Sequence, residues 1–241
     1  MKQAFILAAG LGTRLKPLTD RIPKALVPIG GKPLLHHVMQ RLIDAGFERV
    51  VINVHHFAEQ IIDDVRLNDR FGIDVRISDE RDLLLETGGG LRHAAHLFEP
   101  DSPILIHNVD ILSNVDLSAL YDQGAKADAA LLVSERKTSR YLLFNDAQQL
   151  QGWTNISTGE LRGPALESGT EGLHPLAFAG IHVFSPTLFP LMYSWPERFS
   201  IIDFYLSICA DHKICGYIQP DMSMLDVGKV DSLATAESFI K

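Results

Sequence analysis

The chain is poor in three features that mark whole classes of protein. It has two cysteines in 241 residues, Cys209 and Cys215, too few for a disulfide framework or a four-ligand zinc site. No apolar run reaches the roughly 20 residues that a membrane-spanning helix needs. Lys and Arg number 22 against 30 Asp and Glu, a net charge of −8, which argues against a nucleic-acid surface. We therefore expect a soluble, cytoplasmic protein that binds neither nucleic acid nor membrane.

Apolar, β-branched segments alternate with amphipathic segments through the first half of the chain. Strands are predicted at 4–9, 49–54, 73–78 and 103–108, with helices at 34–46, 58–68 and 90–98. Such alternation gives right-handed crossovers and a mostly parallel sheet that is covered on both faces. The sequence therefore predicts an α/β fold.

The second half is less regular. A strand is predicted at 127–135, followed by an antiparallel hairpin that turns at Asp146 and Ala147. The segment 157–175 is rich in Gly, Pro, Ser, Thr and Glu, so we expect a long loop or an insertion there. A strand at 178–184, a helix at 200–211, strands at 216–220 and 223–228 and a closing helix complete the prediction.

The stretch LAAGLGTRLKPLTDRIPK, residues 7–24, follows the first predicted strand directly. Gly10 and Gly12 can adopt positive φ and let the backbone approach a ligand closely, and successive N–H groups in such a turn form an anion site. Arg14 and Lys24 add two cations, a combination suited to a polyphosphate. The spacing matches neither the Walker loop nor the complete Rossmann fingerprint. An anion site of another type and a simple tight turn both remain open on these residues alone.

Further motifs follow in order along the chain. They are PKALVPIGGKPLL, ETGGGLRHA, HNVDIL, FAGIHVF and MLDVGK, which begin at residues 23, 86, 107, 178 and 224. Together with LAAGLGTRLKPLT they resemble the signature of the sugar-1-phosphate nucleotidyltransferases, or nucleotide-diphosphosugar pyrophosphorylases. The resemblance covers essentially the whole chain. Within the family, the chain is most similar to the N-acetylmuramate-1-phosphate uridylyltransferases and the related mannose- and heptose-1-phosphate enzymes.

The resemblance implies a GT-A-like, Rossmann-like three-layer α/β/α fold with a mixed, mostly parallel sheet. It implies Mg2+-dependent, in-line transfer of a nucleotidyl group from UTP or GTP to a sugar 1-phosphate, with release of pyrophosphate, for cell-wall recycling or surface polysaccharide precursors. The chain has no internal repeat and no linker, so we expect one domain over 1–241. With the resemblance, we expect a nucleotide-binding half at about 1–135, a sugar-binding inserted lobe at about 136–200, and the metal-site return strand and C-terminal helices at 201–241. We expect a monomer or a small homo-oligomer.

The resemblance also assigns roles to particular side chains. Asp110 and Asp226, each beside an apolar strand, would bind Mg2+. Lys24 would contact the reacting phosphates, and Arg14 the departing pyrophosphate. On the residues alone, Asp110 would serve equally well as a helix N-cap. The residues expected to bind the nucleotide are Leu7, Ala8, Ala9, Gly10, Gly12, Thr13, Glu80, Thr87, Gly88, Gly89 and Asn108, and those expected to bind the sugar are Glu167 and Gly180.

Three features depart from the family pattern. Val109 stands before the metal-binding aspartate where the family usually has glycine, so its side chain would either narrow the nucleotide site or point into the core. Lys229 replaces a threonine and adds a cation near the expected metal. The Glu-Lys-Pro motif, which supplies a lysine to the sugar phosphate in many relatives, is missing, and LESGTEG with Glu167 occupies that region.

Two alternative functions follow from these residues. Val109 and Lys229 suggest a nucleotidyltransferase-like regulatory subunit without turnover. A phosphocholine cytidylyltransferase would need an aromatic cage for the quaternary ammonium, and the candidates for it are Tyr141, Trp153 and Trp195.

Histidines are the remaining candidates for a site. His93 and His96 lie three residues apart on a predicted helix, but nothing nearby in the sequence completes a four-ligand metal site. We therefore expect packing or surface roles for this pair. His56 and His107 are further candidates for the wall of the pocket.

Overall fold

Parallel strands form the centre of the molecule. The computed structural model describes residues 1–240. Four of its strands are parallel neighbours in the order β6-β1-β4-β5. They are β1 (Gln3–Leu7), β4 (Arg49–Val54), β5 (Asp74–Asp79) and β6 (Ile104–Asn108). Every residue of β4 is buried, as expected for a strand covered on both faces. The four strands predicted in the first half are confirmed.

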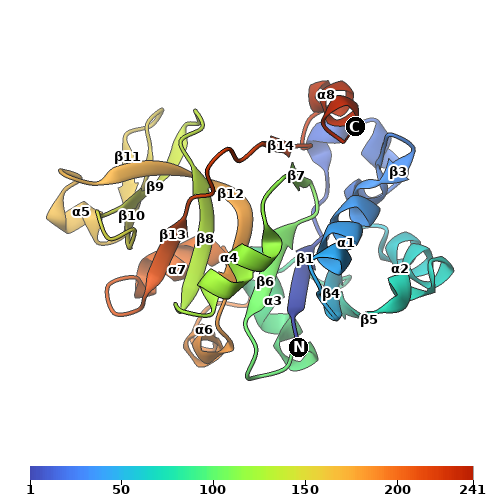
Figure 1. The fold of residues 1–241 in the computed structure, drawn as a ribbon, viewed down its shortest axis with the longest axis horizontal. Coiled ribbons are helices and arrows are strands. Elements are labelled where there is room, and N and C mark those ends of the chain that lie inside the picture. The colour runs from blue at the N-terminus through green and yellow to red at the C-terminus, as the bar shows by residue number, and fades with distance from the viewer. Residues whose placement is uncertain (241) are drawn as a thin grey trace.

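Helices cover both faces of this sheet (Figure 1). One face carries α1 (Leu34–Asp44), α2 (Ala58–Leu67) and α4 (Leu117–Gly124). The other carries α3 (Glu86–His93), α6 (Phe189–Met192) and α7 (Ile201–Ile208). Phe5 and Ile6, neighbours on β1, belong to the two different hydrophobic clusters, because successive side chains of a strand point to opposite faces. The three-layer α/β/α fold is therefore confirmed.

The second half extends the sheet with antiparallel pairs, except that the last of its strands pairs in parallel with the first. Its strands are β8 (Ala129–Ser134), β9 (Arg140–Phe144), β10 (Leu150–Asn155), β11 (Glu160–Arg162), β12 (His174–Phe184) and β13 (Ile214–Tyr217). The long strand β12 pairs with β9 near its start, with β8 from Ala177 onward and with β6 near its end. One continuous sheet thus joins the parallel half to the β9-β10-β11 meander at the left of Figure 1. The predicted hairpin is confirmed, since β9 and β10 are antiparallel.

The segment 157–175 is not the long loop that its composition predicts. It holds β11, the short helix α5 (Ala165–Ser168) and the first residues of β12. Glycines make the turns, with φ of +73° at Gly159 and +80° at Gly163. Strand β11 pairs with β10, so its backbone groups are satisfied by a partner that the local composition does not reveal.

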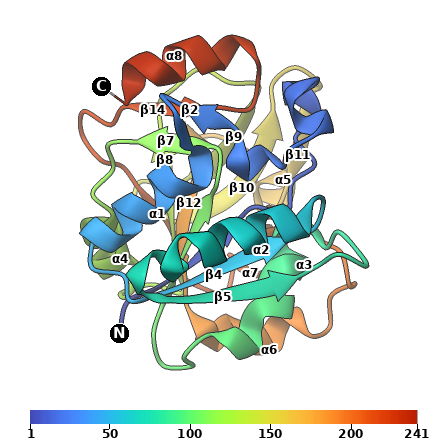
Figure 2. The ribbon, with the colours of Figure 1, turned by 90° about the vertical axis from the view of Figure 1, so that its right-hand side faces the viewer.

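The C-terminal segment returns to the carboxyl end of the sheet. Its strand β14 (Met224–Asp226) is antiparallel to β7 (Ile111–Ser113), which follows β6. Helix α8 (Asp231–Phe239) lies above β14 and the small hairpin of β2 (Pro28–Ile29) and β3 (Lys32–Pro33), as Figure 2 shows. Within residues 1–240, no helix has both the length and the apolar character needed to cross a bilayer.

Candidate active site

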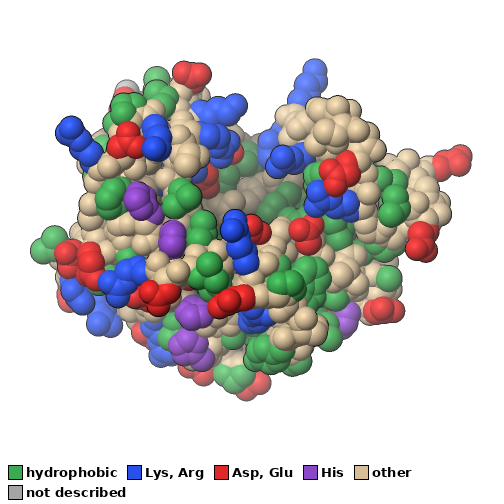
Figure 3. Space-filling view, turned by 180° about the vertical axis from the view of Figure 1, so that it is seen from behind, with side chains coloured by type: hydrophobic (Ala, Val, Ile, Leu, Met, Phe, Trp, Pro, Cys, Tyr) green, Lys and Arg blue, Asp and Glu red, His purple; other side chains and the backbone are tan. Residues whose placement is uncertain are grey.

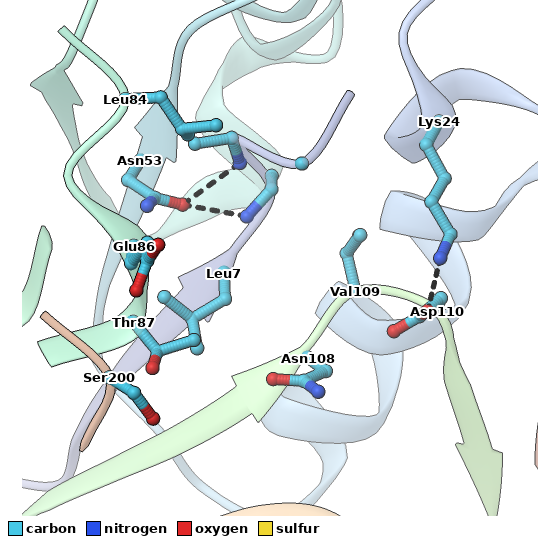
Figure 4. Close-up of a pocket in the computed structure, with 13 residues that line it drawn as sticks. Leu7, Lys24, Asn53, Leu84, Glu86, Thr87, Asn108, Val109, Asp110 and Ser200 are labelled. Carbon is cyan, nitrogen blue, oxygen red and sulfur yellow. Dashed lines mark hydrogen bonds and ion pairs between the residues drawn. The ribbon is translucent and has the colours of Figure 1, made fainter. Parts of the chain in front are cut away.

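A hollow of about 420 Å3 opens at the carboxyl ends of β1 and β6, the edge where α/β sheets bind ligands. The space-filling view in Figure 3 shows a deep depression with Lys and Arg side chains on both of its sides. Figure 4 shows the residues that line the hollow at the ends of β1 and β6, which is called the first hollow. Its lining consists of Leu7, Ala8, Ala9, Gly10, Lys24, Asn53, Leu84, Glu86, Thr87, Asn108, Val109, Asp110 and Ser200.

Asn53, at the end of β4, holds the start of the opening loop in place. Its Oδ1 accepts hydrogen bonds from the backbone N–H groups of Ala8 (2.6 Å) and Ala9 (3.1 Å). Its Nδ2 donates to Oε1 of Glu80 at 2.7 Å. Both ends of the amide are thus engaged, and the loop begins from a fixed position at the floor of the hollow (Figure 4). Asn53 was missed in the sequence, although it is the one amide in the apolar stretch RVVINV.

Glu80 supports this arrangement from behind. Glu80 is 2% exposed, and its Oε2 accepts a hydrogen bond from the Leu85 N–H at 3.2 Å. Burial raises the pKa of the Glu80 carboxyl above its usual range, although the bonds from Asn53 and Leu85 oppose this shift. The Glu80 carboxylate faces Asn53 and Leu85 and lies outside the lining of the hollow, and its expected contact with the base remains a prediction.

Gly12 shapes the next turn of the loop. Its φ is +64°, and a Cβ placed there would lie 2.8 Å from Cγ2 of Thr19. The Gly12 carbonyl accepts a hydrogen bond from Oγ1 of Thr19 at 2.8 Å. A short 3-10 turn over Thr13–Leu15 follows, and Arg14 within it lies outside the lining of the first hollow. Gly12 is therefore required by backbone geometry and close packing, while Gly10 borders the hollow itself.

Lys24 and Asp110 form an ion pair at the mouth of the hollow (Figure 4). Their side chains are 11% and 15% exposed. Lys24 begins a 3-10 turn at Lys24–Leu26, and Asp110 stands in the tight connection between β6 and β7. The structure therefore brings together two charged residues 86 positions apart in the chain, both of which the sequence predicts to act in the reaction.

Asp226 lies beside Asp110 across the β7-β14 pair. Asp226 is the register partner of Ile111, and the Val227 N–H donates to the Asp110 carbonyl at 2.8 Å. A Cβ on Gly228 would lie 2.6 Å from Oδ1 of Asp226 and 2.8 Å from Nη2 of Arg14. The four residues predicted to be catalytic thus gather from three separate segments, although Arg14 and Asp226 lie outside the lining of the first hollow.

The two aspartates fit the chemistry of Mg2+. They offer only carboxylate oxygens, and Mg2+ is commonly bound through one or two carboxylates together with phosphate oxygens and water. In the part of the chain that the structure describes, no group of three or more His, Cys, Asp or Glu could hold a metal. Phosphate oxygens and water would therefore have to complete the coordination.

The glycine run of ETGGGLRHA lies inside helix α3, which begins earlier than the predicted 90–98. The N–H groups of Gly88 and Gly89 donate to the Phe199 carbonyl at 2.9 and 3.2 Å. A Cβ on Gly88 would lie 2.4 Å from the Phe199 ring, and one on Gly89 would lie 2.4 Å from the Glu197 carbonyl oxygen. These glycines let α3 pack against the segment before α7. Their predicted contact with the nucleotide remains a prediction.

Helix α3 contributes two side chains to the hollow. Glu86 has a φ of +63° and its carboxylate accepts from the Arg198 guanidinium at 2.9 Å. Oγ1 of Thr87 accepts from the Ile201 N–H at 2.9 Å. Thr87 was predicted as a residue of the site, whereas Leu84, Glu86 and Ser200 were missed. Nothing in the sequence shows that the segment before α7, which holds Ser200, packs beside α3.

The predicted sugar contacts occupy different places. Gly180 has a φ of +77°, and a Cβ there would lie 2.9 Å from Nδ2 of Asn108. Gly180 therefore lies directly against Asn108, which lines the hollow. Glu167 is exposed on α5 and lines neither of the two hollows described here. Both assignments remain predictions.

A second hollow of about 500 Å3 adjoins the first, and Ser200 lines both. The meander β9-β10-β11 forms much of its floor. The remaining lining residues are Arg136, Thr138, Arg140, Leu142, Trp153, Asn155, Glu160, Arg162, Phe178, Ile202 and Asp203. The sequence analysis missed the basic residues of this hollow. The alternation of cations in SERKTSR just before β9 is the signal that could have indicated them.

The residues that depart from the family pattern are also placed. Val109 is 3% exposed, joins the core and forms part of the wall of the first hollow. Lys229 is exposed, with its N–H donating to Ser232 Oγ. His107 is buried, which lowers its pKa to about 4, and its Nδ1 contacts the Asn108 carbonyl. His107 and the exposed His56 lie outside the lining of both hollows.

Comparison with known proteins places this site in a family. The family model described as Nucleotidyl transferase matches residues 3–141. N-acetylmuramate alpha-1-phosphate uridylyltransferase of Caulobacter vibrioides is 34% identical over 98% of this chain and 96% of its own. The protein of that name from Neisseria meningitidis serogroup B is 32% identical over 78% of this chain and 77% of its own. The solved structure of HddC from Yersinia pseudotuberculosis has a TM-score of 0.79, with 22% identity and complete coverage of both chains. The chain therefore belongs to the nucleotidyl transferase family, as a sugar-1-phosphate nucleotidyltransferase.

Proposed function

We propose that this enzyme transfers a nucleotidyl group from UTP or GTP to a sugar 1-phosphate in a Mg2+-dependent reaction that releases pyrophosphate. The observation that carries the proposal is the convergence of Lys24, Asp110, Asp226 and Arg14 beside a hollow at the carboxyl edge of the sheet. The product would serve cell-wall recycling or the supply of surface polysaccharide precursors.

The reaction joins two anions, so its main requirement is charge neutralisation and alignment. An oxygen of the sugar phosphate attacks the α-phosphorus, and the bond from that phosphorus to the pyrophosphate oxygen breaks. Bound Mg2+ would hold phosphate oxygens and neutralise their charge, with Asp110 and Asp226 as its protein ligands. Lys24 would contact the phosphates at the reacting centre, and Arg14, which lies near Asp226 beside Gly228, the departing pyrophosphate.

The opening loop would position the nucleotide. Asn53 anchors Ala8 and Ala9 to the sheet, and Gly10 leaves the backbone open beside the hollow. A donor surface that is already fixed has little reorganisation to undergo when the triphosphate binds. The relatives in Caulobacter and Neisseria are uridylyltransferases, which favours UTP as the first nucleotide to test.

The alternatives receive less support. An aromatic cage for choline would need open ring faces, but the Arg162 guanidinium stacks on Trp153 at 4.5 Å. Trp195 packs against Phe199 and Phe204, with ring centroids 5.1 and 5.8 Å away. A regulatory subunit without turnover is not favoured either, because Val109 leaves the hollow open and all four charged residues are in place.

The direct test is release of pyrophosphate. The four ribonucleoside triphosphates are each assayed, with and without Mg2+, against N-acetylmuramate, mannose, glucose, N-acetylglucosamine and heptose 1-phosphates, with phosphocholine as the control acceptor. We expect release with UTP or GTP and a sugar 1-phosphate only when Mg2+ is present. Release with phosphocholine and CTP would support the choline enzyme instead. Nucleotide binding without any release would support the regulatory subunit.

A further inference from the structure

Strands β7 and β14 form a two-stranded sheet of their own, which we call the β7-β14 ribbon (Figure 1). Both aspartates expected to bind the metal lie at one end of this ribbon. Asp110 stands directly before β7, and Asp226, the last residue of β14, is the register partner of Ile111. The position of Asp226 relative to Asp110 therefore depends on the register of the ribbon.

Burial of apolar side chains specifies this register only weakly. Met224 packs with the hydrophobic cluster of the parallel sheet, and Leu225 with the cluster that includes α8, so both faces of β14 carry an apolar side chain. A slip by one residue exchanges the two faces of a strand, and here it would exchange one apolar face for another. The same slip would move Asp226 by about 3.4 Å along the strand and turn its carboxylate to the opposite face. A further restraint is therefore needed to hold the two aspartates together.

Asn114 supplies this restraint at the other end of the ribbon. It follows β7 directly and faces Ser223, which precedes β14. The Asn114 N–H donates to the Ser223 carbonyl at 3.0 Å, and the Asn114 Oδ1 accepts from the Ser223 N–H at 2.8 Å. This exchange adds one more pair to the ladder. The Asn114 Nδ2 donates to the Asp221 carbonyl at 3.1 Å, so a slip by one residue would break all three bonds.

A second side-chain amide joins the same two segments. Oε1 of Gln219 accepts from the Asp116 N–H at 2.7 Å, and its Nε2 donates to the Asn114 carbonyl at 3.4 Å. The β7 side is itself fixed to α1, because the Arg41 guanidinium donates to two backbone carbonyls at and just after the end of β7. Asn114 and Gln219 thus fasten β14 to a strand that already has a fixed position.

We propose that Asn114 is a positioning residue for the metal: it fixes the register of the β7-β14 ribbon and so holds Asp226 beside Asp110, with Gln219 in support. Asn114 lies outside the lining of both hollows, so it acts through the ribbon and not on a substrate. The inference rests on the proposed function, since it assumes that the two aspartates bind Mg2+.

The test measures metal affinity and turnover separately. Binding of Mn2+, a paramagnetic substitute for Mg2+, is measured by electron paramagnetic resonance in the presence of α,β-methylene-UTP, and of the corresponding GTP analogue in parallel. In Asn114→Ala we expect the Mn2+ affinity to fall about tenfold, as for other residues that support metal ligands. The Mg2+ concentration for half-maximal pyrophosphate release should rise about tenfold as well. The kcat at saturating Mg2+ should stay within about threefold of wild type, because excess Mg2+ still fills the site.

Matched variants separate positioning from a general loss of stability. Asn145→Ala removes an amide of the same kind, since Oδ1 of Asn145 accepts from the Gln149 N–H at 2.9 Å in the β9-β10 turn, and its Mn2+ affinity should stay at the wild-type value. Asn114→Asp retains the acceptor for the Ser223 N–H and should recover part of the affinity that Asn114→Ala loses. Gln219→Ala should lower the affinity less than Asn114→Ala, because one of its two bonds is long.

Each outcome decides the inference. Wild-type Mn2+ affinity in Asn114→Ala would overturn it, even with a lower melting temperature, because Asn114 would then only stabilise the fold. An equal loss of affinity in Asn145→Ala would overturn it too. If Asn114→Ala does not fold, Asn114→Asp and Gln219→Ala decide by the same measurement, and wild-type affinity in both contradicts the inference.

The same measurements separate this inference from the proposed function. Turnover that depends on Mg2+ equally in wild type and Asn114→Ala would leave the proposed function standing and remove the role of Asn114. Absence of turnover in the wild-type protein with every acceptor would count against the proposed function. Mn2+ binding would then decide the inference alone: a loss specific to Asn114→Ala supports it, and equal binding, or no binding to the wild-type protein, overturns it.

Discussion

The two hollows of this enzyme are built in different ways. The first lies where parallel strands end, and its polar groups are held by buried bonds such as those of Asn53 to Ala8 and Ala9. The second lies on the open face of an antiparallel meander, and its charged groups are exposed side chains such as Arg140. Both meet at Ser200. The polar groups of the first surface are therefore fixed by buried hydrogen bonds, and those of the second are exposed charged side chains.

Under the proposed function, this difference would separate chemistry from selection. Catalytic groups must be held in the productive geometry, so the first hollow depends on tertiary contacts between distant segments. Recognition groups on the face of a sheet can be exchanged without disturbing the backbone. We therefore expect changes in the first hollow to reduce turnover and sometimes stability, and changes in the second to alter the choice of acceptor.

The largest effect is expected at Asp110. Asp110→Asn retains the shape of the side chain but removes the charge that pairs with Lys24 and would bind the metal. Turnover should fall by roughly 1,000-fold or more, in line with the loss of a group that stabilises transition-state charge. The measurement is steady-state pyrophosphate release. Asp122→Asn, at an exposed position of α4, is the matched control, and wild-type turnover in Asp110→Asn would remove the metal assignment.

The next effect is expected at Lys24. Lys24→Ala removes the cation paired with Asp110, and its contacts should strengthen as charge moves to the departing group. We therefore expect kcat to fall about 100-fold and KM for the nucleotide to change much less. Initial-rate kinetics measure both constants, with Lys32→Ala at an exposed position as the control. A rise in KM with normal kcat would show that Lys24 only binds the nucleotide.

A smaller effect, on both stability and nucleotide binding, is expected at Asn53. Asn53→Ala leaves the buried Glu80 without one donor and frees the N–H groups of Ala8 and Ala9. The free energy of unfolding should fall by about 1–3 kcal/mol, the usual cost of a buried group that loses its partner. KM for the nucleotide should rise about tenfold, since the loop is less preorganised. Denaturant unfolding and kinetics test both, with the exposed Asn68→Ala as control. Unchanged KM would mean that the first hollow does not depend on this anchor.

The smallest effect concerns the pH dependence of stability. It involves a buried histidine of β12, the strand that joins the parallel half of the sheet to the β9-β10-β11 meander. His182 is 1% exposed, and burial lowers its pKa to about 3. Burial also lowers the pKa of His107 to about 4. Both histidines bind a proton more readily when the chain is unfolded, so stability should fall as the pH drops from about 6.5 towards 4. Each contributes a slope of at most about 1.4 kcal/mol per pH unit.

His182→Phe isolates one of these contributions. Among the described residues neither ring nitrogen of His182 has a hydrogen-bond partner, and the ring packs against Phe178 and Tyr205. The variant should gain about 1–2 kcal/mol of unfolding free energy and lose part of the pH slope. The exposed His96→Gln should change neither. Two separate unfolding transitions, in place of one, would show that the meander and the parallel half do not share a cooperative core.

Much of this molecule could be predicted from its sequence. Continuous apolar, β-branched segments such as RVVINV predict the parallel strands, because burial on both faces leaves a direct mark on composition. The charged residues Lys24, Asp110 and Asp226 could also be predicted, because each stands in a motif that is contained in a short stretch of sequence. The segment 157–175 shows where local pattern is insufficient, since β11 forms only because β10 is available as a partner.

What only the tertiary structure decided is which side chains meet. The sequence by itself determined the α/β class, the family and the four charged residues, because these follow from periodicity and from motifs within short stretches. Tertiary contacts decided that Glu80 faces Asn53, that the glycines of α3 pack against Phe199, and that Arg136 and Arg140 line a second hollow. Such contacts join residues far apart in the chain, and no local pattern records them before the sheet and its covering helices have formed.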